Sequence, residues 1–278
     1  MANIKLNLIY LSGELTKIDK KFIKEYLKNN GYNAEIITNM DFNNTDIIVA
    51  GTPFVKNNEY INCDYYTGFP VDTFLGLLKP KQIVFAGSIS EDIMKFFPKN
   101  IKLIDVLKDE DVVWSNAMLT AEGLIGEIIK NTDFSLNNSK VLILGFGKCG
   151  TNIASRLFNL NCDVSIYDHT KKHLSQAVSY GYKTLEKDDF SMGLNKFDII
   201  INTVPEVIFT EYNMSLLKKS CVLFEIAGYP YGFDKKLSEK YGISLITCPG
   251  LPGKTAPKAA GELIAKSIIS YLKQKGLG

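Results

Sequence analysis

The chain has 278 residues, a formal net charge of +2 and a hydrophobic content of 46%, values that are typical of a soluble globular protein with room for two domains. Its basic residues are dispersed, so the sequence predicts no nucleic-acid partner, and no apolar run reaches the roughly 18 residues of a membrane span. The five cysteines form no Cys-x-x-Cys pair and the N-terminus lacks an export signal, so we expect reduced thiols, a cytoplasmic protein and no membrane partner.

Short apolar runs alternate with amphipathic segments along the whole chain. This pattern predicts an α/β fold with two doubly wound Rossmann-like domains linked by two long helices. Residues 1–115 are predicted to form a Rossmann-like substrate domain, with a helix over Ile18–Asn29. Its predicted strands lie near Lys5–Tyr10, Ala34–Ile37, Ile47–Ala50, Gln82–Ala86 and Lys102–Ile104.

The two linking helices are predicted over residues 116–135 and 257–275. The apolar stripe of the first consists of Ala121, Leu124, Ile125, Ile128 and Ile129. One face of the second carries Ala260, Leu263, Ile264, Ser267, Ile268 and Tyr271. We expect the second helix to fold back onto the first domain, with an active-site cleft between the two domains.

Residues 136–256 are predicted to form an NAD(P)-binding Rossmann domain. Its expected strands lie near Val141–Leu144, Asp163–Tyr167, Ile199–Asn202, Cys221–Ile226 and Ser244–Cys248. Two segments repeat features of the first half: Asp198–Pro205 resembles Asp46–Pro53, and Cys221–Ile226 resembles Gln82–Gly87. The repetition favours a common architecture for the two domains, although buried parallel strands also resemble one another by chance.

The glycine-rich segment after Val141–Leu144 is the strongest functional signal. It consists of Gly145, Phe146, Gly147, Lys148, Cys149 and Gly150, and the helix Thr151–Leu160 follows it. The first glycine permits a tight turn, the second lets a pyrophosphate approach the backbone, and the third allows close packing of helix on strand. The segment therefore predicts a dinucleotide site at the start of a helix.

Asp168 ends the next strand, where a carboxylate can accept both ribose hydroxyls of NAD and repel the 2′-phosphate of NADP. His169, Thr170 and two lysines follow at once, and such a basic turn could hold a 2′-phosphate if Asp168 swung away. The choice between NAD and NADP therefore stays open. His169 and His173 have no evident third ligand nearby, so no metal site is predicted.

Two further segments are candidates for contact with cofactor or substrate. Thr203, Val204 and Pro205 close a strand whose carboxyl end lies on the cofactor side, so we expect them beside the ribose or nicotinamide. Cys248–Lys258 combines prolines, glycines and lysines, and such a turn either holds a carboxylate or merely reverses the chain.

The residue inventory argues against a common hydroxy-acid dehydrogenase, which needs a catalytic His and an Arg that orients the carboxylate. The two histidines, His169 and His173, both follow the second predicted strand of the nucleotide domain, on the adenosine side. Arg156, which is the one arginine in the chain, lies on the helix after the phosphate loop. No Gly-x-Ser-x-Gly turn or P-loop supports a hydrolase or a phosphotransferase.

Several motifs together resemble the A subunit of dipicolinate synthases. They are Asn116–Gly123, Leu144–Gly150, Ile201–Pro205, Pro249–Gly253 and Ala256–Gly261. The resemblance covers Val113 to the C-terminus, and earlier residues match only in architecture. It implies an enzyme of endospore formation that oxidises dihydrodipicolinate, from 4-hydroxy-tetrahydrodipicolinate, to dipicolinate with NAD or NADP, and that works with a flavoprotein-like B subunit.

The resemblance also suggests residues for a substrate with two carboxylates. Glu122 is the candidate for proton removal or water loss, and Lys258 with the nearby backbone could receive one carboxylate. The candidate set is Glu122, Lys258 and Thr120 for catalysis, with Asn116, Thr52, Gly250 and Gly253 for substrate binding. The alternatives are a Rossmann dehydrogenase of the shikimate or hydroxy-acid type and a non-catalytic NAD(P)-binding partner protein. A homo-oligomer is left open.

Overall fold

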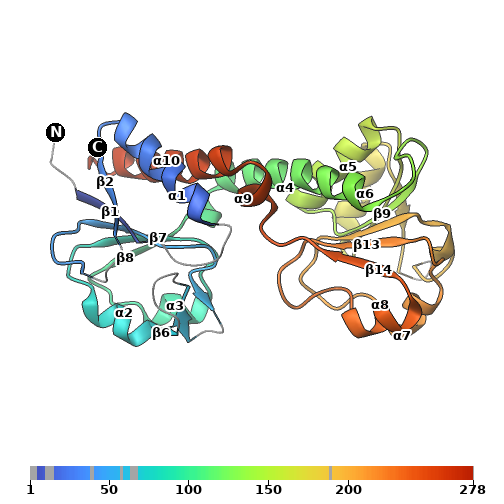
Figure 1. The fold of residues 1–278 in the computed structure, drawn as a ribbon, viewed down its shortest axis with the longest axis horizontal. Coiled ribbons are helices and arrows are strands. Elements are labelled where there is room, and N and C mark those ends of the chain that lie inside the picture. The colour runs from blue at the N-terminus through green and yellow to red at the C-terminus, as the bar shows by residue number, and fades with distance from the viewer. Residues whose placement is uncertain are drawn as a thin grey trace. The chain divides into compact units, whose positions relative to one another are not determined.

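The computed structural model describes residues 5–9, 16–37, 41–56, 59–62, 68–187 and 190–277. The chain divides into two compact units, unit 1 (Met1–Asn116 with Pro252–Gly278) and unit 2 (Ala117–Leu251). Each unit is built around a parallel β-sheet with helices packed against it (Figure 1). The α/β class and the Rossmann-like character predicted from the sequence are therefore confirmed.

Unit 1 contains a five-stranded sheet in the order β2-β1-β3-β7-β8, together with a small antiparallel sheet β4-β5-β6. Its elements are β1 (Lys5–Ile9), α1 (Thr16–Asn29), β2 (Asn33–Ile37), β3 (Ile47–Val49), β4 (Val55–Lys56), β5 (Tyr60–Ile61), β6 (Phe69–Pro70), α2 (Val71–Leu77), β7 (Ile83–Ala86), α3 (Glu91–Phe96), β8 (Lys102–Asp105), the 3₁₀ helix η1 (Val106–Lys108) and α10 (Pro257–Gln274). The small sheet was not predicted, because its two-residue strands are too short to show an alternating pattern.

Unit 2 contains a six-stranded sheet in the order β11-β10-β9-β12-β13-β14, which is the strand order of a dinucleotide-binding Rossmann fold. Its elements are β9 (Lys140–Leu144), α5 (Lys148–Asn159), β10 (Asp163–Tyr167), α6 (Lys171–Ser179), β11 (Lys183–Leu185), the 3₁₀ helix η2 (Leu194–Lys196), β12 (Ile199–Asn202), α7 (Glu211–Ser215), β13 (Val222–Glu225), α8 (Lys235–Tyr241) and β14 (Ser244–Thr247). The chain order reverses between β9 and β12, so the carboxyl ends of these two strands form the switch point where ligands bind.

The repeated segments of the two halves contain strands at equivalent positions in the two sheets. Asp46–Pro53 contains β3 and Asp198–Pro205 contains β12, and each of these strands pairs with the first strand of its sheet on the side of the switch point. The other repeated pair contains β7 and β13, which are the next strands outward in the two sheets. The sequence similarity therefore reflects matching positions in the two sheets.

Both faces of the unit 2 sheet are buried, which explains its continuous apolar strands. In β9, Val141 and Ile143 pack into the core on one face, and Leu142 and Leu144 pack into the core on the other. Burial at this level contributes roughly 1.5–3 kcal/mol for each large apolar side chain. The strand is thereby fixed as the support of the glycine-rich loop that follows it.

The long helix between the units, α4 (Glu110–Asn131), begins earlier than predicted. The side chain of Asp109 accepts a hydrogen bond of 3.0 Å from the backbone N–H of Asp111, and this bond satisfies a donor at the helix start. Ala121, Leu124 and Ile128 are buried as predicted. The prediction that Ile129 belongs to the buried apolar stripe is wrong, because 61% of its surface is exposed.

The chain returns to unit 1 through α9 (Leu251–Thr255), a short helix that the sequence did not predict, and not through a long helix. The following helix, α10, packs within unit 1 against α1, where Ile268 and Leu272 join Ile23 and Leu27 in one core. Ser267 was expected on the apolar face, but its hydroxyl donates to Asp109 at 2.7 Å.

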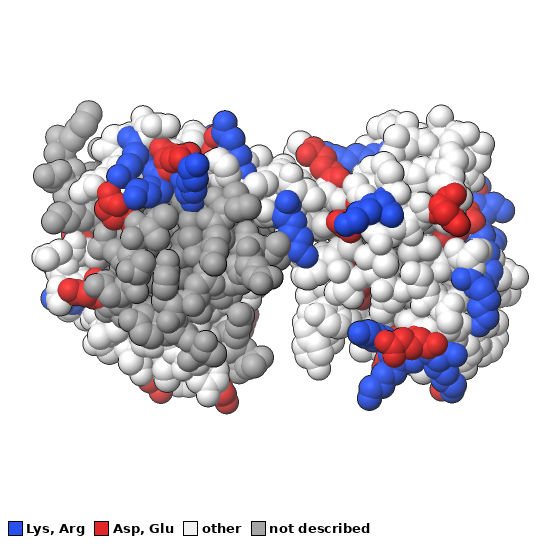
Figure 2. Space-filling model, viewed as in Figure 1, with Lys and Arg blue, Asp and Glu red and all other residues white. Residues whose placement is uncertain are grey.

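Charged side chains of both signs are interspersed over the face of the molecule drawn in Figure 2. Ion pairs among the described residues include Lys183 with Asp163 at 2.7 Å and Lys218 with Asp198 at 2.5 Å. Within the described part of the chain, no helix has the length and apolar character required to cross a bilayer.

Candidate dinucleotide-binding site

The three glycines of the loop between β9 and α5 have different physical roles. Gly145 has a φ of +93°, and a Cβ there would lie 2.5 Å from Oγ1 of Thr203. A Cβ at Gly150 would lie 2.1 Å from the carbonyl oxygen of Gly145. A Cβ at Gly147 would meet no atom within 4 Å. The first and third glycines are therefore required by the chain's own packing, whereas the second leaves open space for a ligand.

The open space at Gly147 adjoins the start of α5. Gly147 is the N-cap of this helix, so no side chain caps the first turn, and that turn contains no acidic residue. A helix start of this kind carries partial positive charge and binds phosphate oxygens through backbone N–H groups. The predicted residues Gly145, Gly147 and Gly150 thus fit the pyrophosphate of a dinucleotide. Burial raises the pKa of the neighbouring Cys149 thiol, which keeps it neutral.

The carboxylate of Asp168 lies directly after β10 and is held by backbone and side-chain donors. Its Oδ2 accepts from the backbone N–H of Phe146 at 2.8 Å and lies 2.9 Å from Nδ1 of His173. Its Oδ1 accepts from the backbone N–H of Thr170 at 2.7 Å. Burial by itself would raise the pKa of Asp168, but these hydrogen bonds together hold it below its ordinary value. The acidic group is therefore fixed beside the glycine-rich loop.

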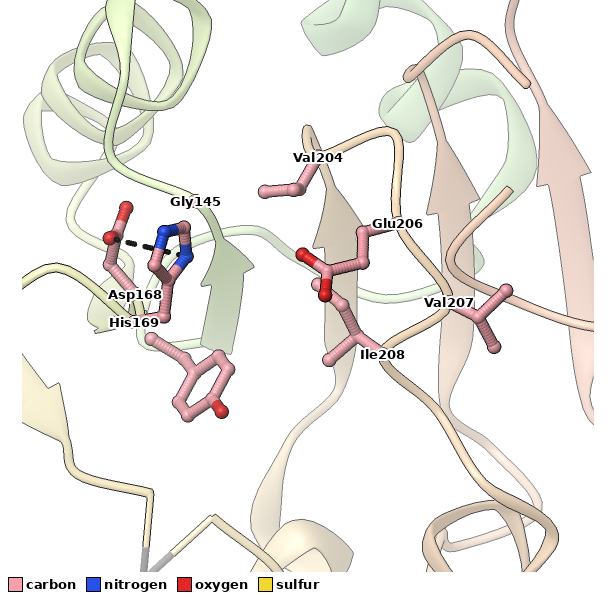
Figure 3. A pocket seen from close by; sticks show the side chains of 8 residues that line it. Gly145, Asp168, His169, Val204, Glu206, Val207 and Ile208 are labelled. Atoms are coloured by element: carbon pink, nitrogen blue, oxygen red, sulfur yellow. Dashed lines mark ion pairs between the residues drawn. The ribbon is translucent and has the colours of Figure 1, made fainter. Parts of the chain in front are cut away.

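A pocket of about 420 Å³ opens between the carboxyl ends of β9, β10 and β12 (Figure 3). Its volume falls in the range of small-molecule sites, roughly 300–1,000 Å³. The lining residues are Gly145, Tyr167, Asp168, His169, Val204, Glu206, Val207 and Ile208. Since the glycine-rich loop and Asp168 both contribute to its lining, the pocket suits the adenosine half of a dinucleotide.

The segment after β12 is tied to the glycine-rich loop. The hydroxyl of Thr203 donates to the carbonyl of Leu144 at 2.8 Å, and Val204 lines the pocket. Pro205 is exposed just beyond them. The structure thus brings Thr203 and Val204 together with Gly145 and Asp168, and the contact of these residues with a bound nucleotide remains a prediction.

A buried polar pair that the sequence analysis missed supports this segment. The side chain of Asn202 donates through Nδ2 to both oxygens of Glu225, at 2.8 and 3.0 Å. Glu225 also accepts from the backbone N–H groups of Ala227, Gly232 and Phe233. Burial raises the pKa of Glu225, against the lowering effect of these hydrogen bonds. An acid at the end of an apolar strand was the available signal, since such a residue is rarely buried without partners.

The predicted catalytic residues have varied environments. Glu122 is 56% exposed, and its Oε1 lies 3.3 Å from Nη2 of Arg156. Thr120 is buried on the same helix. Lys258 is 72% exposed and lies 4.0 Å from Glu262. Their role in catalysis stays a prediction.

The predicted substrate residues are divided between the two units. Gly250 has a φ of +65°, as expected for a turn glycine, whereas Gly253 lies inside α9 instead of in an open turn. Thr52, Asn116, Gly253 and Lys258 belong to unit 1, and Thr120, Glu122 and Gly250 belong to unit 2. The cleft expected between the units remains a prediction.

Comparison with known proteins supports the nucleotide site. Residues 126–227 match the family model of the NAD binding domain of D-isomer specific 2-hydroxyacid dehydrogenases. This segment contains the glycine-rich loop, Asp168 and the Asn202–Glu225 pair. Together with the fit of the loop to a pyrophosphate, the match shows that unit 2 is an NAD(P)-binding domain.

Relatives are found along a larger part of the chain. The A subunit of dipicolinate synthase from Bacillus subtilis (strain 168) is 31% identical over 173 residues, which are 62% of this chain and 58% of that protein. The alignment thus takes in less than two thirds of that relative.

Two solved structures share the fold. The A subunit of dipicolinate synthase from Bacillus halodurans matches with a TM-score of 0.82 at 22% identity, over 96% of this chain and 97% of that chain. The A chain of dipicolinate synthase from Bacillus subtilis matches with a TM-score of 0.81 at 22% identity, over 99% and 98%. The resemblance indicated by the motifs is therefore confirmed: the chain is a two-unit α/β protein with an NAD(P)-binding domain that resembles the dipicolinate synthase A subunit in sequence and in fold.

Proposed function

We propose that the protein is the A subunit of a dipicolinate synthase and oxidises dihydrodipicolinate, formed from 4-hydroxy-tetrahydrodipicolinate, to dipicolinate during sporulation. The open space at Gly147, at the start of α5 and close to the pocket of Asp168, carries the oxidoreductase part of the proposal. The name of the Bacillus subtilis relative supports the choice of substrate. A bound nicotinamide cofactor would supply the hydride acceptor.

The proposed reaction is compatible with the titratable side chains that this chain contains. Dihydrodipicolinate loses one hydride and one proton, so that dihydrodipicolinate and NAD(P)⁺ give dipicolinate, NAD(P)H and a proton. The product ring is aromatic, which favours the step and reduces the need for a strong general acid or base. In unit 2, His173 is engaged with Asp168, so a carboxylate is the better candidate for the proton.

Glu122 is our candidate for that carboxylate. Its exposed side chain can accept a proton from the substrate, and its Oε1 lies 3.3 Å from Nη2 of Arg156. Thr120 precedes it on the same helix, and with Asn116 it offers hydrogen-bonding groups toward one substrate carboxylate. The ammonium of Lys258 would attract the other carboxylate, since its side chain is 72% exposed and lies as far as 4.0 Å from Glu262.

Thr52, Gly250 and Gly253 complete the proposed substrate set through a hydroxyl and backbone groups. We also propose that the protein works with a small flavoprotein-like B subunit, in keeping with the name of its relative. The described cysteines, Cys149, Cys162, Cys221 and Cys248, are free thiols. Free thiols suit a reducing compartment, so we infer a cytoplasmic enzyme.

The decisive experiment mixes the product of dihydrodipicolinate synthase with this protein and NAD or NADP, with and without the B subunit. Nicotinamide reduction is followed by near-ultraviolet absorbance, and dipicolinate is measured by terbium luminescence. We expect both signals to rise together in equal amounts. Absence of dipicolinate under every combination would contradict the assignment.

The match of unit 2 to the 2-hydroxyacid dehydrogenase domain favours a second candidate, an oxidation of a hydroxy acid. The same assay with D-lactate, other 2-hydroxy acids and shikimate separates the two reactions. Turnover of one of these compounds without dipicolinate formation would favour the second candidate. Nucleotide binding without turnover of any substrate would favour a non-catalytic partner protein.

A further inference from the structure

The adenosine pocket of unit 2 has acidic groups on two sides. Asp168 follows β10 on one side, and Glu206 lies in the loop after β12 on the other. Figure 3 shows the Glu206 side chain turned toward the side where Asp168 and His169 lie, whereas Val207 points away from it. The two carboxylates therefore border the space in which the adenosine ribose of a dinucleotide would sit.

Asp168 is fixed in place. Its side chain is only 5% exposed, and both of its oxygens accept hydrogen bonds, from the backbone N–H groups of Phe146 and Thr170. Moving the carboxylate out of the pocket would break these bonds and leave their donors without acceptors, which is unfavourable. The backbone N–H of Thr170, a natural donor for a 2′-phosphate, is likewise already engaged. The turn after β10 is thus organised around the carboxylate.

The basic residues of the same turn do not line the pocket. Lys171 and Lys172 are exposed in the first turn of α6. Among the residues that line the pocket, His169 is the one that can carry positive charge, and its side chain is 78% exposed. A group at the ribose 2′ position would therefore meet two carboxylates and one solvated imidazole.

The two carboxylates act on the same part of the pocket wall. Tyr167 also lines the pocket, and its pKa is raised first by burial and then by the charges of Glu206 and Asp168. Their fields therefore overlap at the position of Tyr167. A 2′-phosphate carries about −1.5 to −2 charges at neutral pH, and like charges brought together in this way are a common means of rejecting a wrong ligand.

We propose that Glu206 is a specificity-determining residue which, with Asp168, makes the site select NAD(H) over NADP(H). The proposal depends on cofactor binding in unit 2, and it goes beyond the proposed function by choosing the cofactor. Asp168 offers its remaining acceptor capacity to the ribose hydroxyls of NAD. Glu206 adds negative charge from the loop after β12, so that a phosphate on the 2′ oxygen is repelled.

The test is a titration of the full-length protein with NADH and with NADPH, followed by fluorescence and by calorimetry at low salt. We expect NADH to bind at least about tenfold more tightly than NADPH, a difference of ~1.4 kcal/mol. In Glu206→Gln, NADPH binding should tighten by about fivefold, as expected from the loss of one charge interaction of about 1 kcal/mol. NADH binding should change little.

Glu211→Gln is the matched control, because Glu211 also follows β12 but pairs with Lys240 and does not line the pocket. It should leave the ratio of the two affinities unchanged. The preference of the wild type for NADH should weaken as salt is added, and this salt effect should be smaller in Glu206→Gln. A purely structural role of Glu206 would not produce this difference.

Equal or tighter binding of NADPH by the wild type would overturn the proposal. An unchanged affinity ratio in Glu206→Gln would also overturn it. Selective NADH binding in a protein that forms no dipicolinate would support the inference while the proposed reaction fails. Absence of binding by either nucleotide would overturn the inference together with the cofactor site on which it depends.

Discussion

The carboxamide of Asn202 donates to both oxygens of the Glu225 carboxylate, and this pair joins two loops at the carboxyl edge of the unit 2 sheet. Asn202 also accepts from the backbone N–H of Val204 through Oδ1 at 3.1 Å. Glu225 collects the backbone N–H groups of the segment that follows β13. The pair therefore positions the loop that contains Val204 and Glu206.

Replacing Glu225 should destabilise unit 2. Glu225→Ala leaves several buried donors without an acceptor, so we expect a loss of about 3–5 kcal/mol in the free energy of unfolding. Glu225→Gln keeps one carbonyl oxygen and should lose less. Urea denaturation followed by circular dichroism measures both values. A Glu225→Ala protein as stable as the wild type would show that the pair is dispensable.

The stabilising effect of Asp168 should depend on pH. Its pKa in the folded protein lies below the ordinary value of 3.8, so the unfolded chain binds the proton more tightly. The stabilisation is therefore fully present above about pH 4 and is lost as the pH falls through the folded-state pKa. Asp168→Asn should be less stable than the wild type by about 1–3 kcal/mol at pH 7, and the difference should shrink below pH 4.

The control for Asp168 is Asp163→Asn, at the other end of β10, where the carboxylate forms an exposed ion pair with Lys183. Exposed pairs contribute about 0–1 kcal/mol, so this variant should change stability only slightly. Denaturation curves recorded between pH 3 and pH 7 measure the stability of both variants relative to the wild type. A stability difference for Asp168→Asn that stays constant over this range would contradict the linkage.

Two alanine substitutions in the glycine-rich loop should have different effects. Gly145→Ala places a Cβ 2.5 Å from Thr203 at a positive φ, so we expect a loss of about 2–4 kcal/mol in stability. Gly147→Ala meets no atom and has a φ of −74°, so stability should change by less than about 0.5 kcal/mol. Nucleotide affinity should nevertheless fall by about tenfold, because the methyl group occupies the space for the pyrophosphate.

Thermal unfolding and NADH titration, run side by side, separate the two effects. If Gly147→Ala bound NADH as tightly as the wild type, the space above this residue would not be the phosphate site.

Glu122→Gln should lower turnover while leaving nucleotide binding unchanged. Loss of a general base typically lowers kcat by about 10²–10⁴-fold. Glu127→Gln is the control, since it lies on the same helix and contacts Asn131. Initial rates of dipicolinate formation as a function of pH provide the measurement. Full activity of Glu122→Gln would remove Glu122 from the mechanism.

Lys258→Ala should raise KM for the substrate by about tenfold through loss of one charge-assisted contact, with a smaller effect on kcat. Lys266→Ala on the same helix is the control, because its ammonium lies over the ring of Tyr26. Both variants are compared at low and high substrate concentration. Normal turnover of Lys258→Ala at low substrate would exclude the carboxylate contact.

The sequence by itself determined the positions of the main strands and of the dinucleotide motif. A buried parallel strand such as β9 is visible as consecutive apolar residues, and the turn after it requires glycine at Gly145 and Gly150 for local steric reasons. These signals lie within short stretches of chain. They can therefore be recognised in the sequence without knowledge of the fold.

Only the tertiary structure decided which side chains are buried or fixed by hydrogen bonds, and which neighbours they contact. Asp168 is fixed by the backbone N–H of Phe146, which follows a different strand, and Glu206 faces it from beyond β12. The exposure of Ile129 and the burial of Glu225 likewise depend on neighbours that are distant in sequence. Helical periodicity gives an apolar face but not the surface against which it packs, because that surface is set by long-range contacts.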